Sequence, residues 1–157
     1  MKSLLLVSSI AATLVGCAPP PGGYPPPYQN LRQISLSEVA GYASSVKTEL
    51  VNETPQQVIE KGKKAIADTL KDPASAQFRN VRLVQYLDGA VICGEINGKN
   101  SYGGYVGFRD FVGGTNSGSM RYEGKYADIN AASNTGIDTA CSGKPYTPTE
   151  GQKDTHT

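Results

Sequence analysis

Two stretches of helical periodicity precede a stretch in which apolar and polar residues alternate. In the first stretch, apolar residues recur at the three- and four-residue spacing of one helix face: Leu36, Val39, Ala43, Val46 and Leu50. Ser35 stands before this run and Glu38 follows three residues later, in the form of a capping box. The pattern predicts a first helix over residues 36–51.

A second helix is predicted to begin at Pro55. Thr54 has the position of a capping residue, and Gln57 stands where a capping box places its second partner. An apolar stripe follows: Val58, Ile59, Gly62, Ala65, Ile66 and Leu70. Pro73 ends this region, because the residue before a proline is disfavoured in the α conformation.

From residue 81 the apolar positions alternate, which is typical of strands that bury one face. A first strand over residues 81–87 is expected to end in a tight turn at Asp88-Gly89. Further strands are expected over residues 90–96, 105–112 and 119–123. Residues 126–132 are expected to form either a helical turn or an irregular return of the chain. These elements predict an α+β domain with two N-terminal helices packed on one face of a small antiparallel β-meander.

The apolar run over residues 4–15 is too short to span a bilayer and has the character of a signal peptide. Leu14-Val15-Gly16-Cys17 resembles the lipobox of bacterial lipoproteins. The resemblance implies removal of residues 1–16 and a diacylglyceryl group on the sulfur of Cys17, an anchor that stays in the membrane. Ala18 in place of aspartate implies the periplasmic leaflet of the outer membrane, with cell-surface exposure as an alternative. An ordinary cleaved signal with an incidental cysteine is the competing interpretation.

Six prolines between residues 18 and 30 favour extended structure and indicate a spacer. Docking of residues 25–28 in an aromatic groove is the alternative. The predicted organisation is a signal peptide at residues 1–16, a lipidated cysteine and proline-rich tether at 17–32, the α+β domain at 33–147 and a disordered tail at 148–157.

Charge balance excludes one class of partner. Of the 15 Lys and Arg residues only Lys2 lies in the export segment, which leaves 14 against 14 acidic residues. A neutral chain lacks the basic surface that a phosphate backbone requires, so no nucleic acid is expected.

With Cys17 lipidated, Cys93 and Cys141 remain in a compartment that oxidises thiols. They are predicted to form a disulfide, with a reactive or metal-binding pair as the alternative. The only histidine, His156, lies in the tail, so neither a metal site nor a histidine-activated nucleophile is expected in the domain, and no cofactor.

The segments 71–80 and 93–108 resemble a family of small exported proteins of Gram-negative bacteria and their phages. The resemblance covers roughly residues 55–112. Because no activity is established for that family, it implies export and the domain boundary and no mechanism.

Carboxylates on neighbouring predicted strands, Glu95, Asp110 and Glu123, raise the alternative of a glycan-acting enzyme with paired carboxylates. The competing interpretation is that Glu95 and Asp110 pair with Arg109, Arg121 or Lys125 across the sheet. We therefore do not expect an enzyme.

Tyrosines interleaved with cations indicate a candidate binding surface, because tyrosine and arginine dominate recognition surfaces. Its members are Tyr102, Tyr105, Arg109, Arg121, Tyr122, Lys125 and Tyr126. The alternative is structural, since half-buried strand tyrosines are common.

Residues 117–122 and 124–126 are similar to the Ser-Gly loop of membrane-bound inhibitors of c-type lysozyme, which makes a lysozyme inhibitor the alternative function. The preferred hypothesis is a membrane-anchored periplasmic lipoprotein that binds an envelope protein or peptidoglycan without catalysis.

Overall fold

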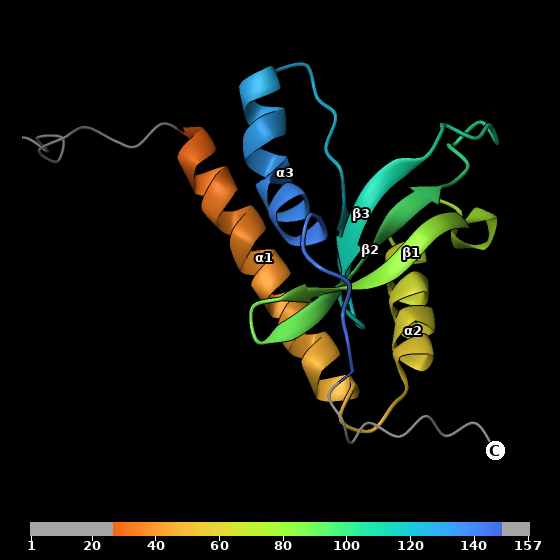
Figure 1. The fold of residues 1–157 in the computed structure, drawn as a ribbon. Helices are drawn as coiled ribbons and strands as arrows, with labels where there is room; N and C mark the ends of the chain where they lie inside the picture. Colours follow the sequence, from red (N-terminus) through yellow and green to blue (C-terminus); the bar gives the residue numbers. More distant parts are fainter. Residues whose placement is uncertain (1–26, 149–157) are drawn as a thin grey trace, which may run out of the picture.

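The computed structural model describes residues 27–148, which form three α-helices, one short 3₁₀ helix and a four-stranded antiparallel sheet. Figure 1 shows α1 (Pro27–Glu49) and α3 (Ala127–Cys141) side by side against the sheet, with α2 (Pro55–Ala67) beyond it. The predicted α+β class is confirmed. The predicted export segment, the cysteine predicted to carry a lipid and residues 149–157 of the predicted tail lie outside the described residues. No helix within residues 27–148 is long and apolar enough to cross a membrane.

Helix α1 begins earlier than its sequence pattern predicts. It starts at Pro27, so residues 27–32 of the predicted tether are helical. The predicted capping box is wrong, because Ser35 lies inside the helix and its Oγ accepts a hydrogen bond from the backbone N–H of Gly136 at 2.8 Å. Ser35 therefore joins α1 to α3 instead of beginning a helix. The predicted apolar face is buried through Val39, Ala43, Val46 and Leu50.

Helix α2 follows its sequence prediction closely. Thr54 caps the helix with its Oγ1, which accepts from the backbone N–H of Gln57, while the Gln57 side chain accepts from the backbone N–H of Thr54. Val58 and Ile66 are fully buried. A Cβ on Gly62 would lie 2.1 Å from Cδ1 of Ile92, so this glycine allows α2 to approach the sheet.

The sheet is the predicted meander, with strands in the order β1-β2-β3-β4. Its strands are β1 (Gln77–Tyr86), β2 (Gly89–Asn97), β3 (Arg109–Gly113) and β4 (Gly118–Met120). The first turn falls one residue earlier than predicted, because Tyr86 pairs with Gly89 and leaves Leu87 and Asp88 between the strands. A Cβ on Gly89 would lie 2.7 Å from the carbonyl oxygen of Ala43, so that glycine serves the contact with α1.

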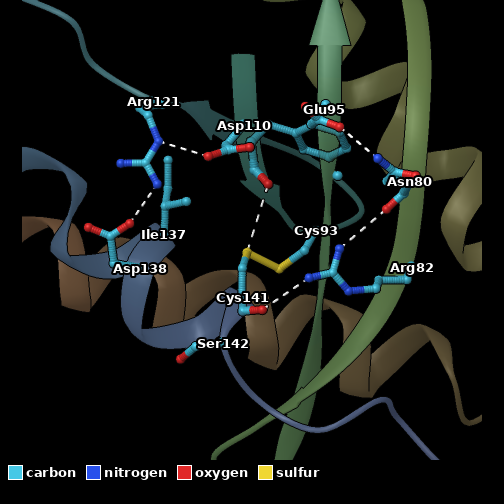
Figure 2. A pocket seen from close by; sticks show the side chains of 12 residues that line it. Asn80, Arg82, Cys93, Glu95, Asp110, Arg121, Ile137, Asp138, Cys141 and Ser142 are labelled. Carbon is cyan, nitrogen blue, oxygen red and sulfur yellow. Dashed lines mark hydrogen bonds and ion pairs between the residues drawn. A yellow bond between two sulfur atoms is a disulfide. The ribbon is translucent and has the colours of Figure 1, made fainter. Parts of the chain in front are cut away.

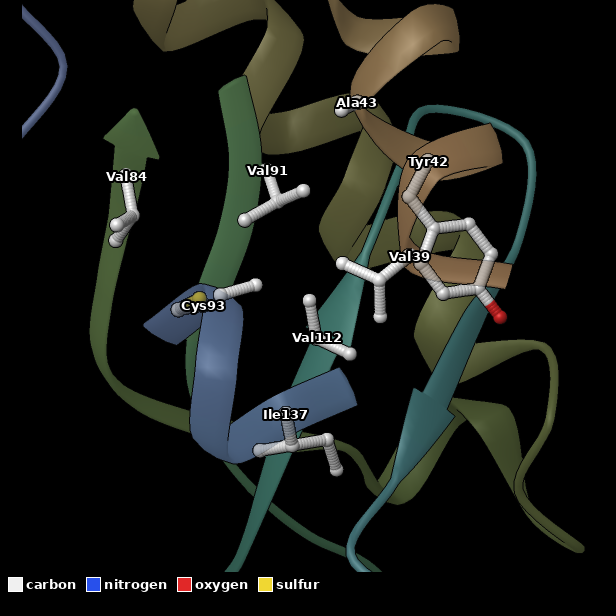
Figure 3. Close-up of a cluster of buried hydrophobic side chains, with 9 residues drawn as sticks. Val39, Tyr42, Ala43, Val84, Val91, Cys93, Val112 and Ile137 are labelled. Atoms are coloured by element: carbon white, nitrogen blue, oxygen red, sulfur yellow. The ribbon is translucent and has the colours of Figure 1, made fainter. Parts of the chain in front are cut away.

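The prediction that the helices pack on one face of the sheet is wrong, because both faces are covered. The cluster in Figure 3 contains Val91 and Cys93 of β2 with residues of α1 and α3. The neighbouring β2 residue Ile92 belongs to a second cluster, which includes Val58 and Ile66 of α2. Successive side chains of a strand point to opposite faces, and the β2 segment is apolar at both sets of positions.

Helix α3 was predicted as no more than a turn or an irregular return over residues 126–132. It is instead a full helix whose buried positions are Ala132, Asn134, Gly136, Ile137 and Ala140. Four of these five residues are small or polar, so the apolar stripe on which the prediction depends is missing. The small residues let α3 lie close to α1, since a Cβ on Gly136 would be 2.5 Å from the carbonyl oxygen of Ser35.

The predicted disulfide is confirmed. Cys93 in β2 and Cys141 at the end of α3 are bonded, with Cα atoms 5.7 Å apart. Cys93 is buried in the cluster between the sheet and α1 and α3. The disulfide therefore ties the last turn of α3 to the central strand.

Strands β3 and β4 are shorter than predicted, and the residues between β2 and β3 form a loop over residues 98–108, here called the β2–β3 loop. Asn100 closes the loop by accepting the backbone N–H groups of Tyr102 and Gly104 at 2.9 and 3.1 Å. Asn97 accepts the N–H of Gly107 at 3.0 Å. These side-chain acceptors, with an isolated bridge between Lys99 and Tyr105, hold a loop where a strand over residues 105–108 was expected.

Candidate functional site

A pocket of about 290 Å³ lies between the sheet and α3, here called the polar pocket. Figure 2 shows the Cys93–Cys141 disulfide in its wall and charged side chains of β1, β2 and β3 around it. Arg82 donates to the carbonyl oxygens of Asn80 and Cys141 at 3.3 and 3.1 Å. Its guanidinium thus connects the first strand with the end of α3.

Glu95 lies at the rim of this pocket and is fully engaged. Arg79 donates to both of its carboxylate oxygens at 2.7 and 2.8 Å, and Asn80 adds a third hydrogen bond at 2.7 Å. The bond from Arg79, followed by that from Asn80, lowers the pKa of Glu95 below its ordinary value. Glu95 is therefore ionised at neutral pH and unsuited to the role of general acid.

Arg121 forms the second charged group of the polar pocket. Its Nε donates to Asp110 at 2.8 Å and its Nη2 to Asp138 of α3 at 2.5 Å. The hydrogen bond that Arg121 donates to Asp138 is the main cause of a raised pKa for Arg121, although partial burial opposes the shift. Figure 2 shows this guanidinium between the two carboxylates. The arginine thus links β3 to α3.

The predicted neighbouring carboxylates do come together in part. Glu95 and Asp110 are directly paired residues of β2 and β3, and both line the polar pocket. The sequence predicted that their partners would be Arg109, Arg121 or Lys125. Asp110 does pair with Arg121. Glu95 pairs instead with Arg79, which was not predicted. Glu123 lies beyond the end of β4 and is not among the residues that line the pocket.

A second pocket of about 300 Å³ lies near the end of α2 and the base of the β2–β3 loop, here called the basic pocket. Three cationic side chains line it: Lys71, Lys99 and Arg109. None of its described lining residues carries a carboxylate, and none of the three cations forms an ion pair within residues 27–148. Its apolar lining consists of Leu70, Ile96, Val106 and Met120.

The tyrosines and cations predicted as one surface fall into separate environments. Tyr102 and Tyr105 belong to the β2–β3 loop, where the Lys99 ammonium lies 5.6 Å from the Tyr105 ring centre. Arg109 lines the basic pocket at the base of that loop, and Arg121 is bound in the polar pocket.

Tyr122, Lys125 and Tyr126 lie in the connection to α3. Asn134 of α3 accepts the N–H of Tyr122 at 2.7 Å and donates to its carbonyl oxygen at 2.9 Å. Asn130 makes the same pair of bonds with Gly124. The Lys125 ammonium lies 5.7 Å from the Tyr126 ring centre. This connection is thus fixed to α3 by two asparagines one helical turn apart.

Sequence reasoning missed Lys71 as a site residue, because nothing in its local sequence connects it with the tyrosines and cations of the predicted surface. The sequence carries no signal for this site, because Lys71 and Arg109 lie in different parts of the chain that come together only in the folded protein. Asp138 was missed for the same reason, as its helix was not predicted.

The segment that resembles the lysozyme-inhibitor loop is part of the sheet. Gly118–Met120 forms β4, and Ser119 bonds the hydroxyl of Tyr42 in α1 at 2.8 Å. A Cβ on Gly118 would lie 2.9 Å from Cδ1 of Ile66. Residues 118–120 are thus a strand packed against two helices, which departs from the loop that the resemblance implies.

No family model matches the chain, and searches of curated proteins and of solved structures find no match.

Proposed function

We propose that this protein is a lipid-anchored, non-catalytic binding module of the bacterial envelope. The sequence Leu14-Val15-Gly16-Cys17 supports the anchor, because a lipid on Cys17 would hold the domain at the outer membrane, facing the periplasm. The binding partner is an envelope protein or peptidoglycan, contacted by the β2–β3 loop.

The observation that carries this proposal is the exposure of the β2–β3 loop. The side chain of Tyr102 is 97 % exposed, and those of Tyr105 and Val106 are 47 % and 55 % exposed. Exposed aromatic and apolar side chains grouped on one loop are typical of recognition surfaces.

The loop is also held in one conformation before any partner binds. Asn100 and Asn97 accept its backbone N–H groups, and Gly103 and Gly107 adopt positive φ angles of 80° and 98°. A preformed loop loses less conformational entropy on association, which favours binding. The charges of the polar pocket, in contrast, are already paired within the protein and offer no free acid and base.

Site-specific photo-crosslinking in intact cells tests the proposal. A photoreactive phenylalanine analogue is placed at residue 102, and a matched analogue at residue 126, another tyrosine that is 60 % exposed, serves as the control. We expect a recurrent envelope protein or peptidoglycan fragment to be captured from residue 102 and not from residue 126. Equal capture from both positions, or only abundant neighbours from residue 102, would contradict the proposal.

A further inference from the structure

The basic pocket concentrates positive charge that nothing in the described chain neutralises. Lys71 follows α2, Lys99 begins the β2–β3 loop and Arg109 opens β3, so three separate elements bring cations to one cavity. Several other cations in residues 27–148 are ion-paired, among them Arg79 and Arg121, whereas these three share one cavity without a carboxylate. Like charges gathered without a counter-ion raise the local positive potential, which favours an anionic ligand.

The remaining wall of this pocket is apolar. Leu70, Val106 and Met120 line it together with Ile96, and Val106 is 55 % exposed although it is a large aliphatic residue. Inorganic phosphate or a small dicarboxylate would use the cations and leave this wall in contact with water. A ligand that carries hydrocarbon beside its negative charge would pair with the cations and also cover the apolar part of the wall.

We propose that the basic pocket binds the phosphate headgroup of an anionic amphiphile. The phosphate lies among the side chains of Lys71, Lys99 and Arg109, and the first part of the hydrocarbon lies against Leu70 and Val106. A cavity of about 300 Å³ has room for a headgroup and a short piece of chain and not for a whole lipid. The inference rests on the proposed function in one respect, since it assigns a ligand class to the base of the same loop.

The test separates the contributions of charge and hydrocarbon. The full chain carries Cys17→Ser, so that no anchor lipid of its own takes part, and is titrated with three soluble probes by isothermal calorimetry. Dihexanoyl phosphatidylglycerol carries both features, glycerol 3-phosphate lacks the chains, and dihexanoyl phosphatidylcholine has no net charge. We expect phosphatidylglycerol to bind about tenfold more tightly than either of the others. Equal binding of phosphatidylglycerol and either comparison probe would overturn the proposal.

Single substitutions in the pocket provide a second measurement. Lys71→Gln and Arg109→Gln should each weaken phosphatidylglycerol binding about tenfold, while Lys144→Gln, at an exposed lysine outside the pocket, should leave it unchanged. Lys71 is exposed and lies outside the helices and strands, so we expect Lys71→Gln to fold and to keep the comparison valid even if Arg109→Gln does not fold. An equal loss in Lys144→Gln would indicate nonspecific attraction and overturn the proposal.

Failure of the amphiphile site and failure of the proposed function give different results. Capture of a partner from residue 102 in cells, with no binding of phosphatidylglycerol in solution, would refute the amphiphile site and leave the binding module in place. Binding of phosphatidylglycerol without capture from residue 102 would support the site and remove the partner proposed for the loop.

Discussion

The polar pocket and the basic pocket lie on opposite faces of one sheet. They differ in whether their charged side chains form ion pairs. The carboxylates that line the polar pocket are paired: Glu95 with Arg79, and Asp110 and Asp138 with Arg121. In the basic pocket, none of the three cations has a carboxylate partner among the described residues. The polar pocket also contains the disulfide, whereas the basic pocket adjoins an exposed loop.

The difference indicates which face is structural and which is available for binding. Charges that are paired across strands and helices hold α3 against the sheet, and a ligand would have to displace those pairs. The three cations of the basic pocket have no ion pair to lose within residues 27–148, and the Lys99 ammonium contacts the ring of Tyr105. We therefore expect changes on the α3 side to affect stability, and changes near the β2–β3 loop to affect binding.

The largest expected effect on stability comes from the disulfide. The double substitution Cys93→Ala and Cys141→Ala removes a bond that closes a loop between residues 48 positions apart. The chain-entropy model gives a loss of about 4 kcal/mol in the free energy of unfolding. Urea denaturation of the oxidised protein and the variant measures it, and a loss below about 1 kcal/mol would mean that α3 does not depend on the bond.

Gly136→Ala is expected to have the next largest effect, because its Cβ would meet the carbonyl oxygen of Ser35 at 2.5 Å. Overpacking of this kind costs roughly 1–3 kcal/mol in the free energy of unfolding. Gly41→Ala is the matched control, since Gly41 lies in α1 with nothing within 4 Å of its Cβ position. The control should be more stable by about 0.5–1 kcal/mol. Similar losses in both variants would rule out close packing of α1 and α3 as the cause.

Asn134→Ala removes both hydrogen bonds to the backbone of Tyr122. We expect a loss of about 1–2 kcal/mol, because a partly buried N–H and carbonyl are left without a partner. Hydrogen exchange should become faster at the Tyr122 amide and remain slow at Gly124, which Asn130 holds separately. Unchanged exchange at Tyr122 would show that Asn134 does not fix the connection.

The smallest effect is a pH dependence that comes from Glu95. Because hydrogen bonds from Arg79 and Asn80 lower its pKa in the folded protein, the folded state releases this proton more readily than the unfolded chain. The stabilisation is complete above the ordinary carboxyl pKa and is lost as pH falls through the lowered value. In Arg79→Gln the pKa of Glu95, followed by NMR, should rise toward its ordinary value, and acid should destabilise the variant less. An unchanged pKa would mean that Arg79 does not hold the carboxylate.

The class of the fold and the path of the sheet were predictable from the sequence, because α2 and β2 carry strong local patterns. Thr54 and Gln57 supply a complete cap, and once Cys17 is assigned to the predicted lipobox the two other cysteines leave one pairing. Helix α3 was missed because its packing depends on Gly136 and Asn134, and small or polar residues give no apolar period. Ser35 was misassigned because its hydroxyl serves a partner 101 positions away in the chain.

The candidate sites were less predictable than the fold. Arg109 and Arg121 were predicted as members of one surface from their neighbouring tyrosines, but they line different pockets in the folded protein. Arg121 meets Asp138 only because α3 lies beside it. Arg109 and Lys71 line the same pocket only because the chain leaving α2 reaches the base of the β2–β3 loop. Neither meeting leaves a signal in the spacing of residues along the chain.

The contrast between the two pockets can be tested in one titration. Backbone amide resonances of the Cys17→Ser full chain are followed by NMR as dihexanoyl phosphatidylglycerol is added. We predict shifts at Lys71 and across residues 98–109, with no change at Gly94, Glu95 and residues 137–142 of the polar pocket. Shifts confined to the polar pocket, or equal shifts around both pockets, would contradict the assignment of structure to one face and binding to the other.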